Sequence, residues 1–197
     1  MLPFKNPHKK QAFSLIEMLL VLGVLSILLL AAFVLYPQLR DSSQANKEAS
    51  NLASIKAVIN NMYLTQGNYQ GLMTGLANQA RAFPASMNEG NYGNVTSSAI
   101  RTSWGGRVQV DNIDYEISLR GASSRVLAPN HSFVIRYFNV PVNICLKLIP
   151  SAAGNFDSIL VGSGSNDTDV LNDNSLDMEA LTTACKGDAI QIAFIST

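Results

Sequence analysis

An uncharged apolar run near the N-terminus constrains this chain more than any other feature. The 19 residues from Met18 to Tyr36 are interrupted only by Gly23 and Ser26, apart from the phenol of Tyr36. A helix of that length spans roughly 28 Å, about the hydrocarbon thickness of a bilayer. Because the backbone must satisfy its own hydrogen bonds inside lipid, the run predicts a membrane-spanning helix.

The charges on either side of the run predict its orientation. Lys5, Lys9 and Lys10 precede it, the first 16 residues hold no acid, and the charges that follow it cancel in pairs. The positive-inside rule therefore places the N-terminus in the cytoplasm and the rest of the chain outside. The run ends without a small-residue cleavage pattern, which favours a retained anchor over an ordinary cleaved signal peptide.

Glu17 is a carboxylate at the N-terminal edge of this run. A charged side chain near lipid is costly unless it is paired, so Glu17 is a candidate functional residue. The alternative is that Glu17 lies among the lipid headgroups, where the cost is small.

The residues around Glu17 resemble a known processing signal. The segment from Lys9 to Leu22 reads KKQAFSLIEMLLVL and resembles the class III signal of type IV pilins. The resemblance implies that prepilin peptidase cuts between Ala12 and Phe13, and that the new N-terminal residue, Phe13, is methylated. It also implies that Glu17, as the fifth mature residue, acts in assembly. The mature chain would then begin at Phe13, and the leader of residues 1–12 would not be part of its fold.

Two features depart from the usual pattern of that family. Gly nearly always precedes the cut, whereas Ala12 stands here, so cleavage is expected to be slower. The leader is longer than in type IVa pilins, although a mature N-terminal Phe is more typical of them. The leader therefore does not settle the subclass.

A second helical pattern follows the apolar run. Pro37 predicts a kink or an interruption after the transmembrane and polymerisation helix of residues 13–36. Apolar residues then recur at spacings of three and four from Leu52 to Met62, which predicts an amphipathic helix over about 38–64 that ends near Gly67. Its polar side is expected to hold Lys47, Glu48, Asn51, Lys56 and Asn60.

Residues 37–197 are expected to form a globular head, which gives the chain the α+β class and the pilin fold. Residues 65–105 predict a loop region with one short helix near 72–83, and residues 106–197 predict an antiparallel sheet with a disulfide-bounded region. The expected strands are 108–111, 113–119, 133–138, 159–161 and 189–195, with a tight turn at Asn112. Further helices are expected over 142–149, where a strand is the competing interpretation, and from about 174 to Cys185.

The two cysteines, Cys145 and Cys185, lie outside the membrane by the topology argument, where disulfides persist. A bridge that closes a loop of about 40 residues contributes roughly 3–4 kcal/mol in the chain-entropy model. A buried pair of free thiols is the alternative. The tract PVNICLKL, from Pro141 to Leu148, together with Cys185 resembles the type IVb group, in particular the PilS-like thin-pilus major pilins. That resemblance favours the bridge.

Composition argues against several classes of function. The chain has 14 basic and 14 acidic residues, so its zero net charge does not suit a nucleic-acid-binding protein. Two Cys and two His are too few for a structural zinc site. The acidic tract 166–173 lacks calcium-loop spacing, residues 162–165 lack a Walker lysine, and His131 has no triad pattern. We therefore expect no enzyme activity, no cofactor and no metal site.

Charge is unevenly distributed along the head. Between the cysteines, six acidic residues stand against Lys147 alone, a net charge of −5. From Arg81 to Arg136, six arginines outnumber four acids, a net charge of +2. Such complementary faces can set the register between subunits. The alternative is that the charges only keep a scattered surface soluble.

Together these features predict a structural subunit of a type IV pilus. The expected partners are further copies of the chain in a helical filament, prepilin peptidase, and the pilus assembly machinery in the inner membrane. The subunit is expected in the inner membrane, with a periplasmic head, before it joins an extracellular pilus for attachment, cell-cell contact or conjugation. The alternatives are a minor pilin, a type II secretion pseudopilin, and a membrane-anchored binding domain that never assembles.

Overall fold

The computed structural model describes residues 14–93, 96, 99–120, 126–163, 167–173 and 175–197. The chain divides into two units, one that ends at Arg40 and one that covers Asp41–Thr197. In the described residues, the first unit holds helix only, and the second unit holds the sheets and the remaining helices.

Helix α1 covers Leu15–Tyr63, 49 residues, and contributes to both units. It continues through Pro37, so of the predicted kink or interruption the interruption is wrong, and the kink stays a prediction. A proline removes one backbone donor, but the leucine-rich turns before it and the sheet-packed turns after it outweigh that loss. The helix ends one residue before the expected Leu64, and Gly67 takes a φ of 71° in the turn that follows.

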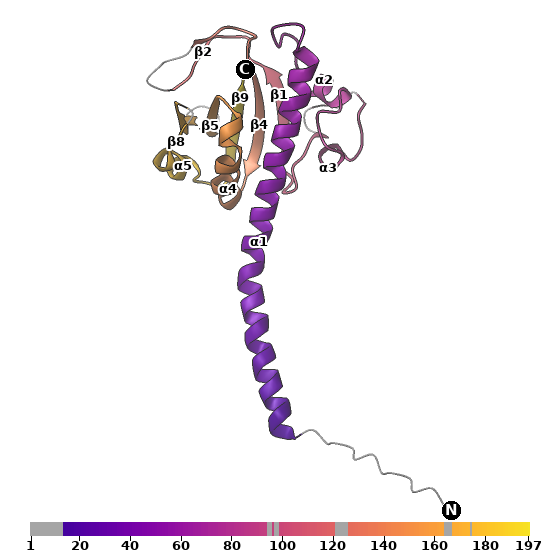
Figure 1. Ribbon diagram of the computed structural model, residues 1–197, viewed down its shortest axis with the longest axis vertical. Coiled ribbons are helices and arrows are strands. Elements are labelled where there is room, and N and C mark those ends of the chain that lie inside the picture. Colours follow the sequence, from indigo (N-terminus) through magenta and orange to yellow (C-terminus); the bar gives the residue numbers. More distant parts are fainter. Residues whose placement is uncertain (1–13, 94–95, 97–98, 121–125, 164–166, 174) are drawn as a thin grey trace, which may run out of the picture. The chain divides into compact units, whose positions relative to one another are not determined.

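A five-stranded sheet forms the centre of the second unit (Figure 1). Its order is β1, β4, β9, β5 and β6, and every neighbouring pair is antiparallel. The strands are β1 (Val108–Asn112), β4 (Phe133–Val140), β9 (Ile190–Ser196), β5 (Ser158–Gly162) and β6 (Thr168–Asp169). The expected α+β class, with its antiparallel sheet, is therefore confirmed.

The connections place β9 in the middle of the sheet. After β4, helix α4 (Val142–Ala152) and the short 3-10 helix η2 (Ala153–Asn155) lead to β5. Helix α5 (Met178–Ala184) then leads to β9, which pairs with β4 on one side and with β5 on the other. The helix predicted over 142–149 is confirmed, and the competing strand interpretation is wrong.

The part of α1 that lies in the second unit packs its apolar stripe on one face of the sheet. Leu52, Ile55 and Ile59 are 0% exposed and share a core cluster with Val110 of β1 and Phe194 of β9. Figure 1 shows this part of α1 alongside β1 and β4. The stripe therefore finds its partner within the chain, as its spacing predicts.

The opposite face of the sheet carries a smaller core. A two-stranded hairpin, β2 (Ile117–Ser118) and β3 (Val126–Leu127), supplies Ile117, which packs against this core. The buried members of the smaller core are Ile113, Val134, Ala193 and Ile195. Both faces of the central strands are therefore covered.

The segment from 113 to 119 differs from the prediction. Only two of its residues form a strand, which pairs with β3 rather than with β1. The predicted tight turn at Asn112 is also wrong, because Asn112 is the last residue of β1. Its N–H donates to the carbonyl of Leu72 at 3.2 Å, and its side chain donates to Asn130 Oδ1 at 2.6 Å. These bonds satisfy the end of β1 in an extended conformation.

The short helix predicted near 72–83 is confirmed as α2 (Thr74–Gln79), and a second short helix that was not predicted, α3 (Ala85–Asn88), follows it. Arg81 lies between them with a φ of 61°, a left-handed conformation that ends helices. Pro84 then disfavours a helical conformation for the residue before it.

The last predicted helix starts later than expected, because a hairpin of β7 (Leu171–Asn172) and β8 (Ser175–Leu176) precedes it. Asp177 caps the helix: its carboxylate accepts hydrogen bonds from two backbone N–H groups in the first turn of α5. The helix ends beside Cys185, as predicted.

Candidate functional site

An exposed apolar surface covers α1 in the first unit. Among the described residues, α1 is the one helix long and apolar enough to cross a membrane, and none of its apolar stretch is buried. Leu15, Leu30 and Phe33 are 77%, 67% and 74% exposed. Water solvates such a surface poorly, so the surface needs lipid or other protein around it.

Glu17 is the one acidic residue among the described residues of this surface. It lies exposed in the first turn of α1, and its N–H donates to the carbonyl of Ser14 at 3.0 Å. Within the described part of the chain, no side chain pairs with its carboxylate. Ala12 and Phe13, the predicted cleavage and methylation residues, lie outside the described residues.

Neither interruption of the apolar run depends on contacts with another part of the chain. Ser26 Oγ donates to the carbonyl of Leu22 at 2.7 Å, so this hydroxyl is satisfied inside its own helix. A Cβ placed on Gly23 would meet no atom within 4 Å, so no close packing inside the chain requires the glycine there.

A buried carboxylate lies in the second half of α1. The polar, solvent-facing side predicted for Glu48 and Asn51 is wrong, because they are only 1% and 8% exposed. Glu48 accepts hydrogen bonds from Asn51 Nδ2 at 3.1 Å, the Ser103 N–H at 3.3 Å and the Tyr137 hydroxyl at 3.4 Å. The carboxylate thus joins the helix, the loop before β1, and β4.

The surroundings of Glu48 change its acidity. Burial raises the pKa of Glu48, and its hydrogen bonds oppose that rise. Burial, with the nearby Glu48 carboxylate, also raises the pKa of Tyr137. The sequence did hold a signal for this site, because Glu48 is spaced three residues from Ala45 and four from Leu52, both on the buried stripe.

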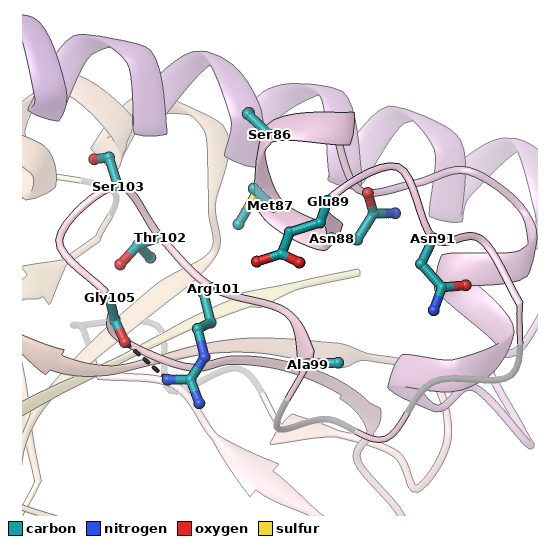
Figure 2. A pocket seen from close by; sticks show the side chains of 10 residues that line it. All are labelled: Ser86, Met87, Asn88, Glu89, Asn91, Ala99, Arg101, Thr102, Ser103 and Gly105. Carbon is teal, nitrogen blue, oxygen red and sulfur yellow. Dashed lines mark hydrogen bonds between the residues drawn. The ribbon is translucent and has the colours of Figure 1, made fainter.

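A polar pocket lies between α3 and the chain that leads into β1 (Figure 2). Its volume is about 640 Å³. Glu89 and Arg101, of opposite charge, line it together with Ser86 and Ser103. Arg101 donates from Nη1 to the carbonyl of Gly105 at 3.1 Å. The loop composition of this segment did not predict a pocket.

Part of the predicted charge complementarity is satisfied inside the subunit. Arg120, from the basic segment, lies 3.4 Å from the Asp177 carboxylate of the acidic segment. It also donates to the carbonyl of Asp169 at 2.8 Å. Arg136 and Asp111 form a second ion pair at 3.1 Å. These arginines therefore already have acceptors without a neighbouring subunit.

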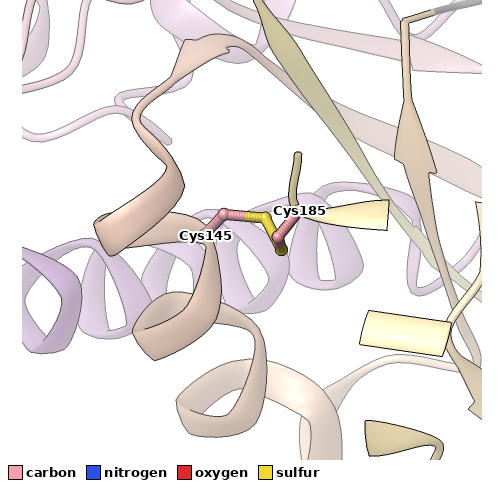
Figure 3. Close-up of a disulfide and its surroundings, with 2 residues drawn as sticks. All are labelled: Cys145 and Cys185. Atoms are coloured by element: carbon pink, nitrogen blue, oxygen red, sulfur yellow. A yellow bond between two sulfur atoms is a disulfide. The ribbon is translucent and has the colours of Figure 1, made fainter. Parts of the chain in front are cut away.

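A disulfide joins Cys145 of α4 to Cys185 at the end of α5 (Figure 3). The two Cα atoms are 6.0 Å apart, and both side chains are buried. Cys145 shares the buried face of α4 with Ile144 and Leu148. The bridge therefore ties the end of α5 to a helix that is itself part of the core.

The remaining sequence candidates have ordinary structural surroundings. His131 is exposed, with Nδ1 3.0 Å from the carbonyl oxygen of Pro129. In the acidic tract, Asp169 accepts from the Ser158 hydroxyl at 2.9 Å and from the Leu171 N–H at 3.0 Å. The described part of the chain holds no group of three or more His, Cys, Asp or Glu side chains that suits a metal ion.

Two known families match this chain. The prokaryotic N-terminal methylation motif matches residues 7–33, which include Glu17 and most of the apolar run. The PilS N-terminal family matches residues 42–197, well over half of the chain and nearly all of the second unit.

Curated relatives include the major structural subunit of bundle-forming pilus from Escherichia coli O127:H6 (strain E2348/69 / EPEC) and that from Escherichia coli O111:H-. Each is 27% identical over 105 residues, which is 53% of this chain and 52% of the relative. The chain therefore spans about half the length of the curated relatives that it matches.

Solved structures that resemble this chain include two pilins. One is TcpA, a type IV pilin from Vibrio cholerae El Tor biotype, at 16% identity and a TM-score of 0.45, covering 80% of this chain and 99% of that one. The other is a type IV b pilin from Salmonella typhi, at 19% identity and a TM-score of 0.48, covering 77% and 99%. On the strength of the family match, this chain belongs to the PilS N-terminal family and is a pilin.

Proposed function

We propose that this pilin polymerises through the exposed apolar part of α1, as a major structural subunit of its pilus. The observation that carries the proposal is the apolar helical surface with one carboxylate, Glu17, at its start. The head does not need that surface, because residues after Arg40 supply the stripe that packs on the sheet. In a filament, the apolar surfaces of many copies bury one another and release water.

Processing precedes assembly in this proposal. Prepilin peptidase removes residues 1–12 by cutting between Ala12 and Phe13, and the new amine of Phe13 is methylated. The match to the N-terminal methylation motif supports this order, and the lysines of the leader support a cytoplasmic N-terminus. The head then faces the periplasm until the inner-membrane assembly machinery moves the subunit into an extracellular pilus.

Glu17 sets the register between subunits. Its carboxylate pairs with the methylated amine of Phe13 in a neighbouring copy, so both charges are neutralised inside the apolar bundle. Burying either charge alone is costly, so an axial stagger that leaves them apart is unfavourable. The stagger that pairs the two groups is therefore preferred.

The variant Glu17→Ala tests this role. It leaves a cationic amine in the bundle without its partner, which should cost about 3–5 kcal/mol per subunit contact and stop assembly. Leader cleavage, membrane insertion and the disulfide should survive, while sheared surface filaments disappear. Glu116→Ala is the matched control, because it removes an exposed carboxylate from the head and should leave filament yield unchanged.

Each part of the proposal has its own failing result. A normal filament yield from Glu17→Ala would exclude the charge pair and leave Glu17 as a headgroup-level residue. Intact-mass analysis that finds Met1 on assembled protein would exclude the processing step. Trace amounts of the chain in sheared filaments would favour a minor pilin or a pseudopilin, and its absence from them would favour an anchor that never assembles.

A further inference from the structure

We propose that the polar pocket beside α3 binds a small zwitterion of the amino-acid class, with the ligand's ammonium on Glu89 and its carboxylate on Arg101. This site lies in the head and supplies a small-molecule binding function that polymerisation does not need.

The two charged side chains enter the pocket without neutralising each other. Glu89 and Arg101 both line the pocket, and Figure 2 shows the Arg101 guanidinium turned toward Gly105 rather than toward the Glu89 carboxylate. The ion pairs of the described residues lie elsewhere, and within those residues Glu89 has no side-chain partner. The bond from Arg101 Nη1 to Gly105 orients the guanidinium and leaves its other N–H groups for a ligand.

Buried polar side chains hold the wall that carries Glu89. Asn78 is 0% exposed, donates to the carbonyl of Asn91 at 2.9 Å and accepts from Asn88 Nδ2 at 2.7 Å. Asn88 Oδ1 in turn accepts from the Gly90 N–H at 3.0 Å. These hydrogen bonds therefore hold the turn that carries Glu89 in place without a ligand.

The wall that carries Arg101 is fixed as well. The Arg101 N–H donates to the carbonyl of Met87 at 2.8 Å, which ties this segment directly to α3. The Ser103 N–H donates to the buried Glu48 carboxylate at 3.3 Å. Both charged side chains thus extend from ordered backbone, so binding requires little further ordering of the protein.

The chemistry of the pocket selects a zwitterion over a singly charged ion. The Glu89 carboxylate would repel an anion, and the Arg101 guanidinium would repel a cation. No aromatic side chain occurs among the described residues that line the pocket, so it offers no stacking platform for a sugar. Its volume of about 640 Å³ falls in the usual range for small-molecule sites, about 300–1,000 Å³.

A matched set of ligands tests the charge requirement. Alanine carries both charges, ethylamine carries the ammonium alone, and propionate carries the carboxylate alone. Ligand-observed NMR on the full chain in detergent, with its disulfide intact, measures their binding. Alanine should bind at least about tenfold more tightly than either analogue, because each analogue lacks one charge-assisted contact.

Two variants assign the contacts. Glu89→Gln should weaken alanine binding about tenfold and remove the preference over propionate, which lacks the ammonium. Arg101→Gln should weaken it similarly and remove the preference over ethylamine, which lacks the carboxylate. Both side chains are exposed, so the fold should be retained. Glu116→Gln and Lys186→Gln change exposed charges outside the pocket and should leave binding unchanged.

Several results would overturn the proposal. These are equal binding of the three ligands, alanine binding that survives in both pocket variants, and no alanine binding by the folded full chain. Binding of a monosaccharide in place of alanine would overturn it too. Filament assembly does not enter these measurements, so they are independent of the proposed polymerisation.

Discussion

The two halves of α1 differ in what surrounds their apolar side chains. Up to Arg40, every large apolar side chain that the structure describes is exposed. After Asp41, the apolar side chains at Leu52 and Ile55 are buried against the sheet of the same chain. One helix therefore carries a surface without a partner and a surface that already has one.

The sequence pattern explains this difference. The second half is apolar on one face, so packing on a single sheet buries its apolar side chains. The first half is apolar all round, and one neighbouring surface cannot cover it. A helix of that kind needs lipid or several other helices on every side, as the proposed assembly of the subunits would supply.

The largest effects should come from placing one carboxylate in each half. Ile55→Asp buries an unpaired charge in the head and should lower its free energy of unfolding by more than about 3 kcal/mol. Leu28→Asp should leave the head folded. It should reduce membrane insertion, because a charge at the centre of a membrane-spanning helix costs about 2.5–3.5 kcal/mol. It should also abolish filaments. Protease resistance and membrane fractionation separate the two outcomes.

That contrast can fail in either direction. If Leu28→Asp unfolded the head, the first half would be part of the head's own core. If Ile55→Asp left the head protease-resistant, the second half would not be packed on the sheet as described. Leu28→Ala is the control, because it shortens the side chain in the first half without adding a charge.

Removing the disulfide should act on the head alone. Replacing Cys145 and Cys185 by Ser opens a loop of about 40 residues and should lower the free energy of unfolding by roughly 3–4 kcal/mol. Denaturant unfolding of the full chain in detergent measures this loss, and membrane insertion should be unchanged. Quantitative thiol labelling of the untreated wild-type protein would contradict the bridge.

Glu48 should give the head a pH dependence. Because burial raises its folded-state pKa above the ordinary 4.5, the folded chain binds this proton more tightly than the unfolded chain does. The contribution of Glu48 to stability is therefore full below the ordinary pKa and is lost as the pH rises through the folded pKa. Glu48→Gln removes this term while its amide can still accept the Ser103 N–H.

The measurement is the difference in unfolding free energy between Glu48→Gln and wild type across about pH 4 to about pH 8. As the pH rises, Glu48→Gln should become more stable relative to wild type. The exposed control Glu116→Gln should show no such drift. A pH-independent difference for Glu48→Gln would mean that the buried carboxylate has an ordinary acidity.

The smallest effect should come from Ser26→Ala in the first half. The Ser26 hydroxyl already donates to the carbonyl of Leu22, so it needs no acceptor on another subunit. Head stability should stay within about 0.5 kcal/mol of wild type, and filament yield should not change. Loss of filaments in Ser26→Ala would show that the hydroxyl contacts a neighbouring copy.

Periodicity was sufficient to predict the elements that carry a clear stripe or a clear alternation. The helical spacing from Leu52 to Met62 and the apolar run both appear in α1, and the alternating segments 133–138 and 189–195 appear in β4 and β9. The α+β class followed from these elements. The assembly role of Glu17 rests on a motif rather than on periodicity, and it stays a prediction.

Contacts distant in sequence decided what the pattern could not predict. Asn112 stays extended because Leu72 and Asn130 bond to it, although its residue type favours a turn. Glu48 can be buried because the Tyr137 hydroxyl and the Ser103 N–H, on other elements, donate hydrogen bonds to its carboxylate. The pocket at Glu89 and Arg101 depends on loops whose course is set by buried asparagines rather than by any local period.

The central position of β9 means that the sheet can close only when the last residues of the chain are present. Until residues 190–196 insert, β4 and β5 each present an open edge, and the sheet is two separate pieces. Since chains emerge from their N-terminus onward, the membrane anchor is complete long before the sheet can close. A subunit that lacks residues 190–197 would therefore leave β4 and β5 without their shared partner strand, and its head should be open to proteases.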